Sequence, residues 1–466
     1  MSCLKILYTI CIILILTIAC KKETFYTGKD AKLTFSMDTV MFDTVFTSIG
    51  SATQRLKVYN NYDKTIKITS IYMGEAEHSL FILNINGINT NNVTDIEIDP
   101  KDSITIFIQF FMKPSGNNQA LLIKDSLIFE LNQNKQKVLF EAFGQDVHLI
   151  KDQTLQTQNW IADKPYLIFG NVLVDSLATL TIDKGVKLFF HRNANLKVKG
   201  TLIAKGDYQN PITLGGDRLE ELYRNIEGQW GGIQLLPGSK NNILEWLIIK
   251  NGISGIQVGD YNESSMVNLN LSNTIIQNMS YNCLLAICAQ ITANNCVFAN
   301  ADVYTCSLLD GGDYNFYQCT FADYSKSNSA LCITDIDSKN QRTYSTVHSK
   351  FQNCIIYGND DDELILNFSK FYANEPFFLN CLLKSIKYTK DSTQFTNCLW
   401  NKLPVFKNDK DPTNFELDSL SVARKNGDYN CGLKYPFDLK MNNRVLNKQP
   451  DIGAYEYVQK TTFGIN

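Results

Sequence analysis

Four charged residues in the second half of the chain could carry out acid–base chemistry. Asp310 and Asp313 flank a pair of glycines, and the basic residues Arg342 and Lys350 follow them. Carboxylates and basic side chains can donate or accept a proton at a reacting bond. Because glycine readily adopts positive φ, the Asp-Gly-Gly-Asp segment is equally typical of a turn. The residues alone support both interpretations.

An acidic run further on could bind a cation. Asp360, Asp361, Asp362 and Glu363 are consecutive, and carboxylate oxygens are ligands that calcium prefers. A run of this kind is also typical of a solvated loop. The four histidines are scattered, and no cysteine pair has Cys-x-x-Cys spacing, so the sequence does not predict a zinc site.

Tyrosines offer flat surfaces on which sugar rings could stack. The candidates are Tyr304, Tyr314, Tyr324 and Tyr344. An aromatic face along a regular groove could hold an extended glycan. Packing between loops, with the hydroxyl group in water, is the alternative use of the same residue type.

Short strands must position these residues. Between Leu180 and Gly216, three aliphatic and β-branched runs each stop at a glycine, which is typical of a strand that meets a tight turn. Further on, a repeat of one amide, one small residue and two apolar residues recurs. Its copies are Asn273–Ile276, Asn295–Phe298, Gln318–Phe321, Asn353–Ile356, Asn380–Leu383 and Asn397–Trp400. The second positions are 274, 296, 319, 354, 381 and 398, and such spacing indicates one supersecondary unit per repeat.

These patterns predict a parallel β-helix of about nine coils, in which each strand pairs with its counterpart one coil away. Equivalent residues then stack. We expect the recurrent asparagines to form an inward ladder at a bend and the recurrent cysteines to form an interior stack. Stacked residues lie about 4.8 Å apart. A disulfide prefers Cβ atoms roughly 3.5–4.5 Å apart, so we expect mostly free thiols.

The preceding part of the chain alternates apolar and polar residues with a period of two, as half-buried strands do. About seven such strands within residues 31–147 indicate an immunoglobulin-like β-sandwich. Residues 148–159 are expected to be a linker, residues 160–457 the parallel β-helix, and residues 458–466 a C-terminal tail. The fold class is therefore all-β.

The beginning of the chain carries an export signal. Lys5 precedes an apolar run that is shorter than the roughly 20 residues a membrane-spanning helix needs, which is typical of a signal peptide. The residues up to Cys20 resemble a bacterial lipobox, whose cysteine becomes lipidated, although Thr17 stands where leucine is usual. We expect residues 1–19 to be a lipoprotein signal peptide and residues 20–30 a lipidated tether. A secreted protein with an incidental cysteine is the alternative.

The second half resembles the right-handed parallel β-helix of the pectate-lyase-like superfamily, in the variety carried by lipoproteins of Bacteroidota-type bacteria. The segments that carry the resemblance are Leu180–Gly185, Leu196–Gly206, Gln229–Ile233, Asp310–Tyr314, the Asn-Cys repeats and Asp451–Glu456. The last of these resembles a terminal strand that seals the coil. The sandwich resembles the ASH-type domain of bacterial envelope proteins.

The resemblance implies one of two functions. Enzymes of the superfamily cut acidic polysaccharides, so a lyase or hydrolase would use Asp310, Asp313, Arg342 or Lys350, and calcium is expected only in that case. Because the sequence holds no complete catalytic constellation, we expect a non-catalytic envelope scaffold that binds glycan or protein. The net charge of −3, without a long basic tract, argues against nucleic acid. We expect a monomer, attached by its lipid to the outer membrane.

Overall fold

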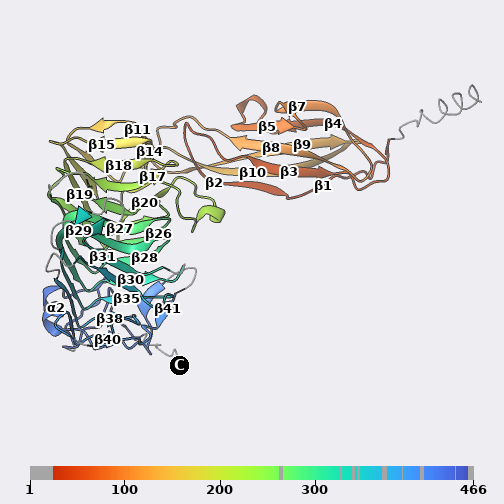
Figure 1. The fold of residues 1–466 in the computed structure, drawn as a ribbon. Coiled ribbons are helices and arrows are strands. Elements are labelled where there is room, and N and C mark those ends of the chain that lie inside the picture. Colours follow the sequence, from red (N-terminus) through yellow and green to blue (C-terminus); the bar gives the residue numbers. More distant parts are fainter. Residues whose placement is uncertain are drawn as a thin grey trace, which may run out of the picture. The chain divides into compact units, whose positions relative to one another are not determined.

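The chain divides into two compact units, residues 1–146 and 147–466 (Figure 1). The computed structural model describes residues 25–261, 266–325, 328–337, 342–343, 347–369, 375–390, 392–409, 414–446 and 448–459. Cys20 and Tyr344 lie outside these residues, as does the side chain of Arg342. No helix among the described residues is long and apolar enough to cross a membrane.

The first unit is a two-sheet β-sandwich. One sheet has the order β1 (Thr34–Phe35), β3 (Gln54–Tyr59), β8 (Ser103–Phe110), β5 (Phe81–Ile85) and β6 (Ile88–Asn89). The other has the order β2 (Thr39–Phe46), β10 (Asn134–Gln145), β9 (Leu121–Leu131), β4 (Ile66–Met73) and β7 (Asn92–Ile98). Alternate residues such as Leu56 and Val58 are fully buried between the sheets, as the period of two predicts. A short 3-10 turn, η1 (Ala76–His78), joins β4 to β5.

The second unit is a coil of parallel strands. Within the described residues, one side of the coil is an eleven-stranded sheet, called sheet 1 here. Its strands are β11 (His148–Lys151), β14 (Tyr166–Phe169), β17 (Lys187–Phe190), β20 (Ile212–Gly216), β23 (Leu247–Lys250), β26 (Ile275–Met279), β28 (Val297–Ala301), β30 (Thr320–Asp323), β35 (Ile355–Gly358), β38 (Leu382–Leu383) and β40 (Leu399–Trp400). The number of these strands exceeds the nine coils that the sequence predicts, partly because the coil already begins at His148. Residues 148–159, predicted to be a linker, therefore belong to the coil, and Leu155 is buried in its core.

The rest of the coil wall is a seventeen-stranded sheet, called sheet 2 here, through which the chain passes twice per coil. Its strands are β12 (Thr154–Leu155), β13 (Gln158–Trp160), β15 (Asn171–Val174), β16 (Thr179–Asp183), β18 (Asn195–Val198), β19 (Thr201–Lys205), β21 (Gly232–Leu235), β22 (Asn242–Glu245), β24 (Ile256–Val258), β25 (Val267–Ser272), β27 (Asn282–Asn294), β29 (Tyr304–Tyr317), β31 (Leu331–Thr334), β34 (Val347–Gln352), β36 (Leu364–Asn367), β37 (Glu375–Leu379) and β39 (Phe395–Thr396). In β27 and β29 the two passes merge into one long strand. The remaining elements are η2 (Glu221–Tyr223), β32 (Ile336–Asp337), β33 (Arg342–Thr343), β41 (Phe406–Asn408), β42 (Asn414–Leu417) and α2 (Tyr429–Lys434).

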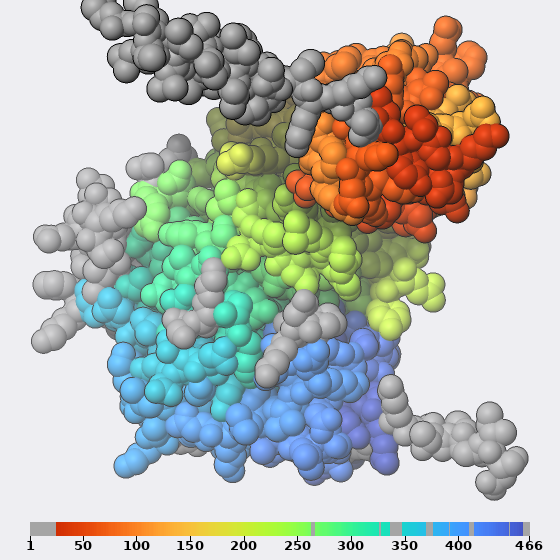
Figure 2. Space-filling model, turned by 90° about the vertical axis from the view of Figure 1, so that its right-hand side faces the viewer, coloured from red at the N-terminus to blue at the C-terminus, as the bar shows by residue number. Residues whose placement is uncertain are grey.

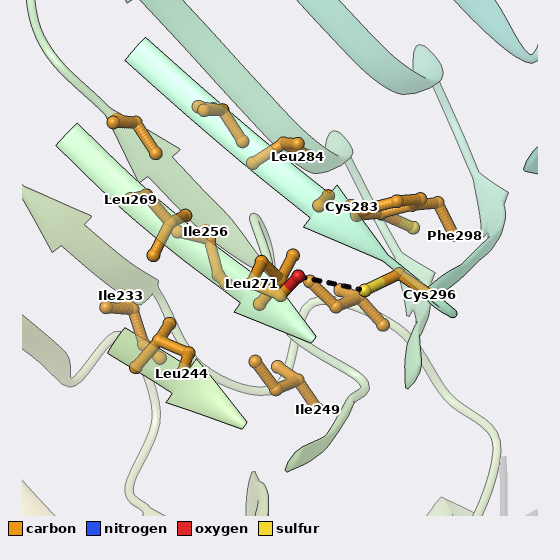
Figure 3. Packing of buried hydrophobic residues seen from close by; sticks show 14 of the residues in the cluster. Ile233, Leu244, Ile249, Ile256, Leu269, Leu271, Cys283, Leu284, Cys296 and Phe298 are labelled. Carbon is orange, nitrogen blue, oxygen red and sulfur yellow. Dashed lines mark hydrogen bonds between the residues drawn. The ribbon is translucent and has the colours of Figure 1, made fainter. Parts of the chain in front are cut away.

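Equivalent residues stack inside the coil, as predicted. Figure 3 shows Ile233, Leu244 and Ile249 packed beneath the next coils. In later coils Phe316, Phe351, Phe378 and Phe395 stack with ring centroids 4.9–5.1 Å apart. The recurrent cysteines belong to the same interior, and the ten cysteines among the described residues are free thiols.

The asparagine ladder occupies the predicted bend but not the predicted side. Asn295 and Asn353 have φ of 52° and 54°, a left-handed conformation that asparagine tolerates. Their amides face outward and bond to the end of the chain, because the next residue already fills the interior. Asn295 Nδ2 donates to Phe437 O over 2.9 Å, and Asn353 Nδ2 donates to Asp428 O over 3.1 Å. The prediction of an inward ladder was therefore wrong.

The end of the chain covers part of sheet 1 from outside. Residues 405–409, 414–446 and 448–457, the covering segment, lie against the later coils (blue in Figure 2). Gly453 N donates to Asn353 O over 2.8 Å, and Ala454 N donates to Thr320 Oγ1 over 3.0 Å. Asp451–Glu456 is thus not a terminal strand that seals the coil. It lies along the coil wall, where Gly453 permits close approach, since a Cβ there would be 2.7 Å from Ile355 Cδ1.

Candidate functional site: a cleft on sheet 1

The Asp-Gly-Gly-Asp segment bends within β29 and is not a turn between coils. Asp310, Gly311 and Gly312 all have positive φ, and the register to β27 shifts at this point. Asp310 is 2% exposed. Tyr314 is fully buried, and its hydroxyl donates to Gly311 O over 2.8 Å. These side chains build the bend, and neither can reach a polymeric substrate.

Asp313 and Lys350 are the two acid–base candidates that share an outer face of sheet 2. Asp313 accepts a hydrogen bond from Asn315 Nδ2 over 2.8 Å, and Asn315 pairs in register with Lys350 on β34. The Lys350 ammonium lies 5.9 Å from the centroid of the Tyr317 ring. Asp310 lies in the wall behind this face. The described residues therefore bring Asp313 and Lys350 to one face but leave Asp310 out of it.

The acidic run does not form a cation site among the described residues. Glu363 is fully buried and accepts hydrogen bonds from the backbone N–H of Asp360 and Ala330, over 2.7 and 2.8 Å. Burial raises the pKa of Glu363 to about 8. Asp362 instead bonds Ser385, while Asp361 is exposed. No described group of three or more His, Cys, Asp or Glu residues could hold a metal ion.

The predicted tyrosines do not form a common platform. Tyr304 is half-buried at the start of β29. Tyr324 packs against Phe406 and Phe415 of the covering segment, with ring centroids 6.1 and 6.3 Å away. Burial raises the pKa of the Tyr304 and Tyr324 hydroxyls. These tyrosines hold the fold together at separate places.

Sheet 1 instead carries a cleft of about 440 Å³ at the edge of the area that the covering segment occupies. This volume falls within the range of small-molecule sites, roughly 300–1,000 Å³. The lining residues come from the coil wall and from the covering segment. They are Ile248, Lys250, Ile275, Gln277, Val297, Lys407, Asn408, Asn414, Phe415 and Tyr455. The cleft combines apolar contact surface with lysine and amide groups, as a site for a polar ligand with an apolar face would require.

One sequence signal could have indicated this cleft. Leu247 and Ile249 fill the interior, so Ile248 must point outward, and so must Ile275 and Val297 on the next strands. Outward residues of a solvated strand are normally polar. Apolar residues at three stacked outward positions therefore indicate a cover or a ligand.

Comparison with known proteins agrees with this geometry. Residues 170–321 match a family model described as "Right handed beta helix region". The coil is a right-handed parallel β-helix. The predicted all-β fold class, a sandwich followed by this β-helix, is thereby confirmed. No curated protein matches the chain.

Several solved structures resemble parts of the chain. The periplasmic chaperone SfaE has a TM-score of 0.18 and 15% identity, over 25% of this chain and 58% of that one. A family 123 glycoside hydrolase from Clostridium perfringens has a TM-score of 0.19 and 6% identity, over 27% and 26%. The catalytic domain of a GH87 alpha-1,3-glucanase in complex with nigerose has a TM-score of 0.19 and 10% identity, over 75% and 87%. The chain thus spans little more than half of the chaperone and about a quarter of the family 123 hydrolase. Because these TM-scores are so low, the likenesses support no function for this chain.

Proposed function

We propose that this chain is a cell-envelope lipoprotein whose β-helix binds glycan without cleaving it. The observation that carries the proposal is the cleft on sheet 1, where the half-buried side chains of Ile248 and Ile275 share an outer face with the amide of Gln277. Sugars present apolar ring faces to apolar side chains and hydroxyl groups to amides. The separation of Asp310 from Asp313 and Lys350 supports binding rather than catalysis.

A glycan array probed with the chain from residue 20 onward tests this function. We expect binding to a defined set of glycans, and no product when the same glycans are incubated with the protein in solution. A polysaccharide lyase would produce unsaturated uronates that absorb ultraviolet light, and a hydrolase would release new reducing ends. Either product would overturn the proposal in favour of an enzyme built on Asp313 and Lys350.

Membrane attachment is the second part of the proposal. The lipobox-like sequence supports lipidation at Cys20 and an outer-membrane location, with the protein acting as a monomer. Replacing this residue, Cys20→Ser, should move the protein from the membrane fraction to the soluble fraction. Unchanged fractionation would show that another feature holds the protein in the envelope.

A further inference from the structure

The floor of the cleft consists of two stacked rows of outward side chains. Ile248 on β23 pairs in register with Ile275 on β26, and the row continues to Val297 on β28, which is already buried beneath the covering segment. Two residues further along the strands, Lys250 pairs in register with Gln277. A ligand on this floor meets an apolar row and a row of hydrogen-bond donors side by side.

The donors carry unbalanced positive charge. The Lys250 side chain makes no hydrogen bond or ion pair with any described residue, and burial, together with Arg224, lowers the pKa of its ammonium. Lys407 on the opposite wall is paired with Glu416 over 2.7 Å, but Lys440 shares the same carboxylate. Two lysines thus balance a single acid there. The described residues that line the cleft include no carboxylate, so the site favours an anion.

The donor arrangement favours a tetrahedral anion over a carboxylate. A lysine ammonium acts as a point charge that binds phosphate-like groups, whereas the planar arginine guanidinium pairs with carboxylate and phosphate alike, so the arrangement of the donors must decide. Among the described residues, the lining contains two lysines and three amides. Because Lys250 and Gln277 lie on the floor while Lys407 and Asn414 lie on the wall, the donors approach from two directions. Several oxygens of one tetrahedral group could each receive a donor.

We propose that the cleft binds a sugar that carries a sulfate or phosphate ester, with the ester held by Lys250 and the ring lying against Ile248 and Ile275. This inference rests on the proposed function, since it names the class of glycan that this site takes. Lys250 sets the preference, because it is the lysine on the floor and has no partner of its own among the described residues.

Calorimetric titration of four matched oligosaccharides tests the preference: one sulfated, one phosphorylated, one carrying only carboxylates and one neutral. We expect the sulfated or the phosphorylated member to bind at least tenfold more tightly than the other two, and the two ester arms identify which ester is used. Lys250→Met should weaken that binding by roughly 10–100-fold, as expected for a lost hydrogen bond to a charged group. Lys187→Met provides the matched control. Lys187 lies on the same outer face of sheet 1, in register with Thr213, two strands before Ile248, and should leave binding unchanged.

The outcomes separate this inference from the function on which it rests. Binding that is equal for the neutral and ester-bearing sugars, or that survives Lys250→Met, would overturn the ester site while leaving a glycan-binding β-helix. Preference for the carboxylated member would also overturn it. If none of the four binds, titration with inorganic sulfate and phosphate decides. If either ion binds and Lys250→Met abolishes that binding, the anion site stands without the glycan. If neither ion binds, the whole inference is overturned.

Discussion

Two stretches of sheet 1 have the same interior and opposite exteriors. At β17 and β20 the outward residues Lys187 and Thr213 face solvent. At β28 and β35 the corresponding outward face carries Val297 and Ile355, which are buried beneath the covering segment. Strand length and pairing hardly change between the two stretches. The inward residues therefore determine the fold. The outward residues are polar where the strand faces solvent and apolar where another segment covers it.

The cleft lies between these two stretches, at β23 and β26. There the outward residues are already apolar at Ile248 and Ile275, but the covering segment leaves them partly open. A cleft can thus form on a β-helix where a covering segment leaves apolar outward residues partly open. No change in the coil itself is needed.

The strongest test of this comparison removes the arginine that holds the cover together. Arg444 is 1% exposed, and it donates to Glu456 over 2.7 Å and to Asn295 and Gly453 over 3.1 Å. Arg444→Met would leave the buried acceptors on Glu456, Asn295 and Gly453 without their common donor, which costs about 3–5 kcal/mol. We expect that loss in the free energy of unfolding, measured in guanidinium by tryptophan fluorescence. All four tryptophans lie in the second unit, so the signal reports on the coil.

An exposed arginine in the uncovered stretch is the control. Arg192 lies on the surface between β17 and β18, and Arg192→Met should change stability by less than about 0.5 kcal/mol. Equal losses for the two variants would show that the cover does not stabilise the later coils.

The second test uses pH, because the later coils bury an acid. The pKa of Glu363 is raised from 4.5 to about 8 in the folded protein. The folded state therefore holds this proton more tightly than the unfolded state. Its contribution to stability is fully present below about pH 4.5, and it is lost as the pH rises toward 8. We expect the free energy of unfolding to fall over this range.

Glu363→Gln isolates this contribution. An amide cannot accept from both backbone N–H groups that Glu363 serves, so the variant should lose about 1–3 kcal/mol at low pH. Its stability should then depend less on pH, and the difference from the parent should shrink toward pH 9. Asp361→Asn, at the exposed neighbouring position, should leave the profile unchanged. Parallel pH profiles for the Glu363→Gln variant and its parent would exclude Glu363 as the titrating group.

The sequence predicts those features of the coil that depend on neighbouring repeats. Stacking of the amide-cysteine repeat follows from its spacing alone, because each coil needs only its neighbours. The outward amides could not be predicted in this way, since Asn295 bonds to Phe437, which is 142 positions away. Asp310 was misjudged for a related reason. A glycine pair signals positive φ, but whether it forms a loop or a bend within a strand depends on the packing against Ala289.

The smallest effect is expected inside the coil, at the recurrent cysteines. In the first repeat the position is Thr274, whose hydroxyl donates to the carbonyl two residues earlier, Ser272 O, over 2.9 Å. In the later repeats the thiol takes the same role, as in Cys354, which lies 3.5 Å from Gln352 O. A hydroxyl group can therefore replace the thiol without losing its partner. Cys354→Ser should cost only about 1 kcal/mol, in the range of a buried hydroxyl that keeps a hydrogen bond. The reverse change, Thr274→Cys, should cost no more. If Cys354→Ser instead cost as much as Arg444→Met, the thiol stack would stabilise the later coils through contacts among the sulfur atoms, and interior and exterior would both distinguish the two stretches of sheet 1.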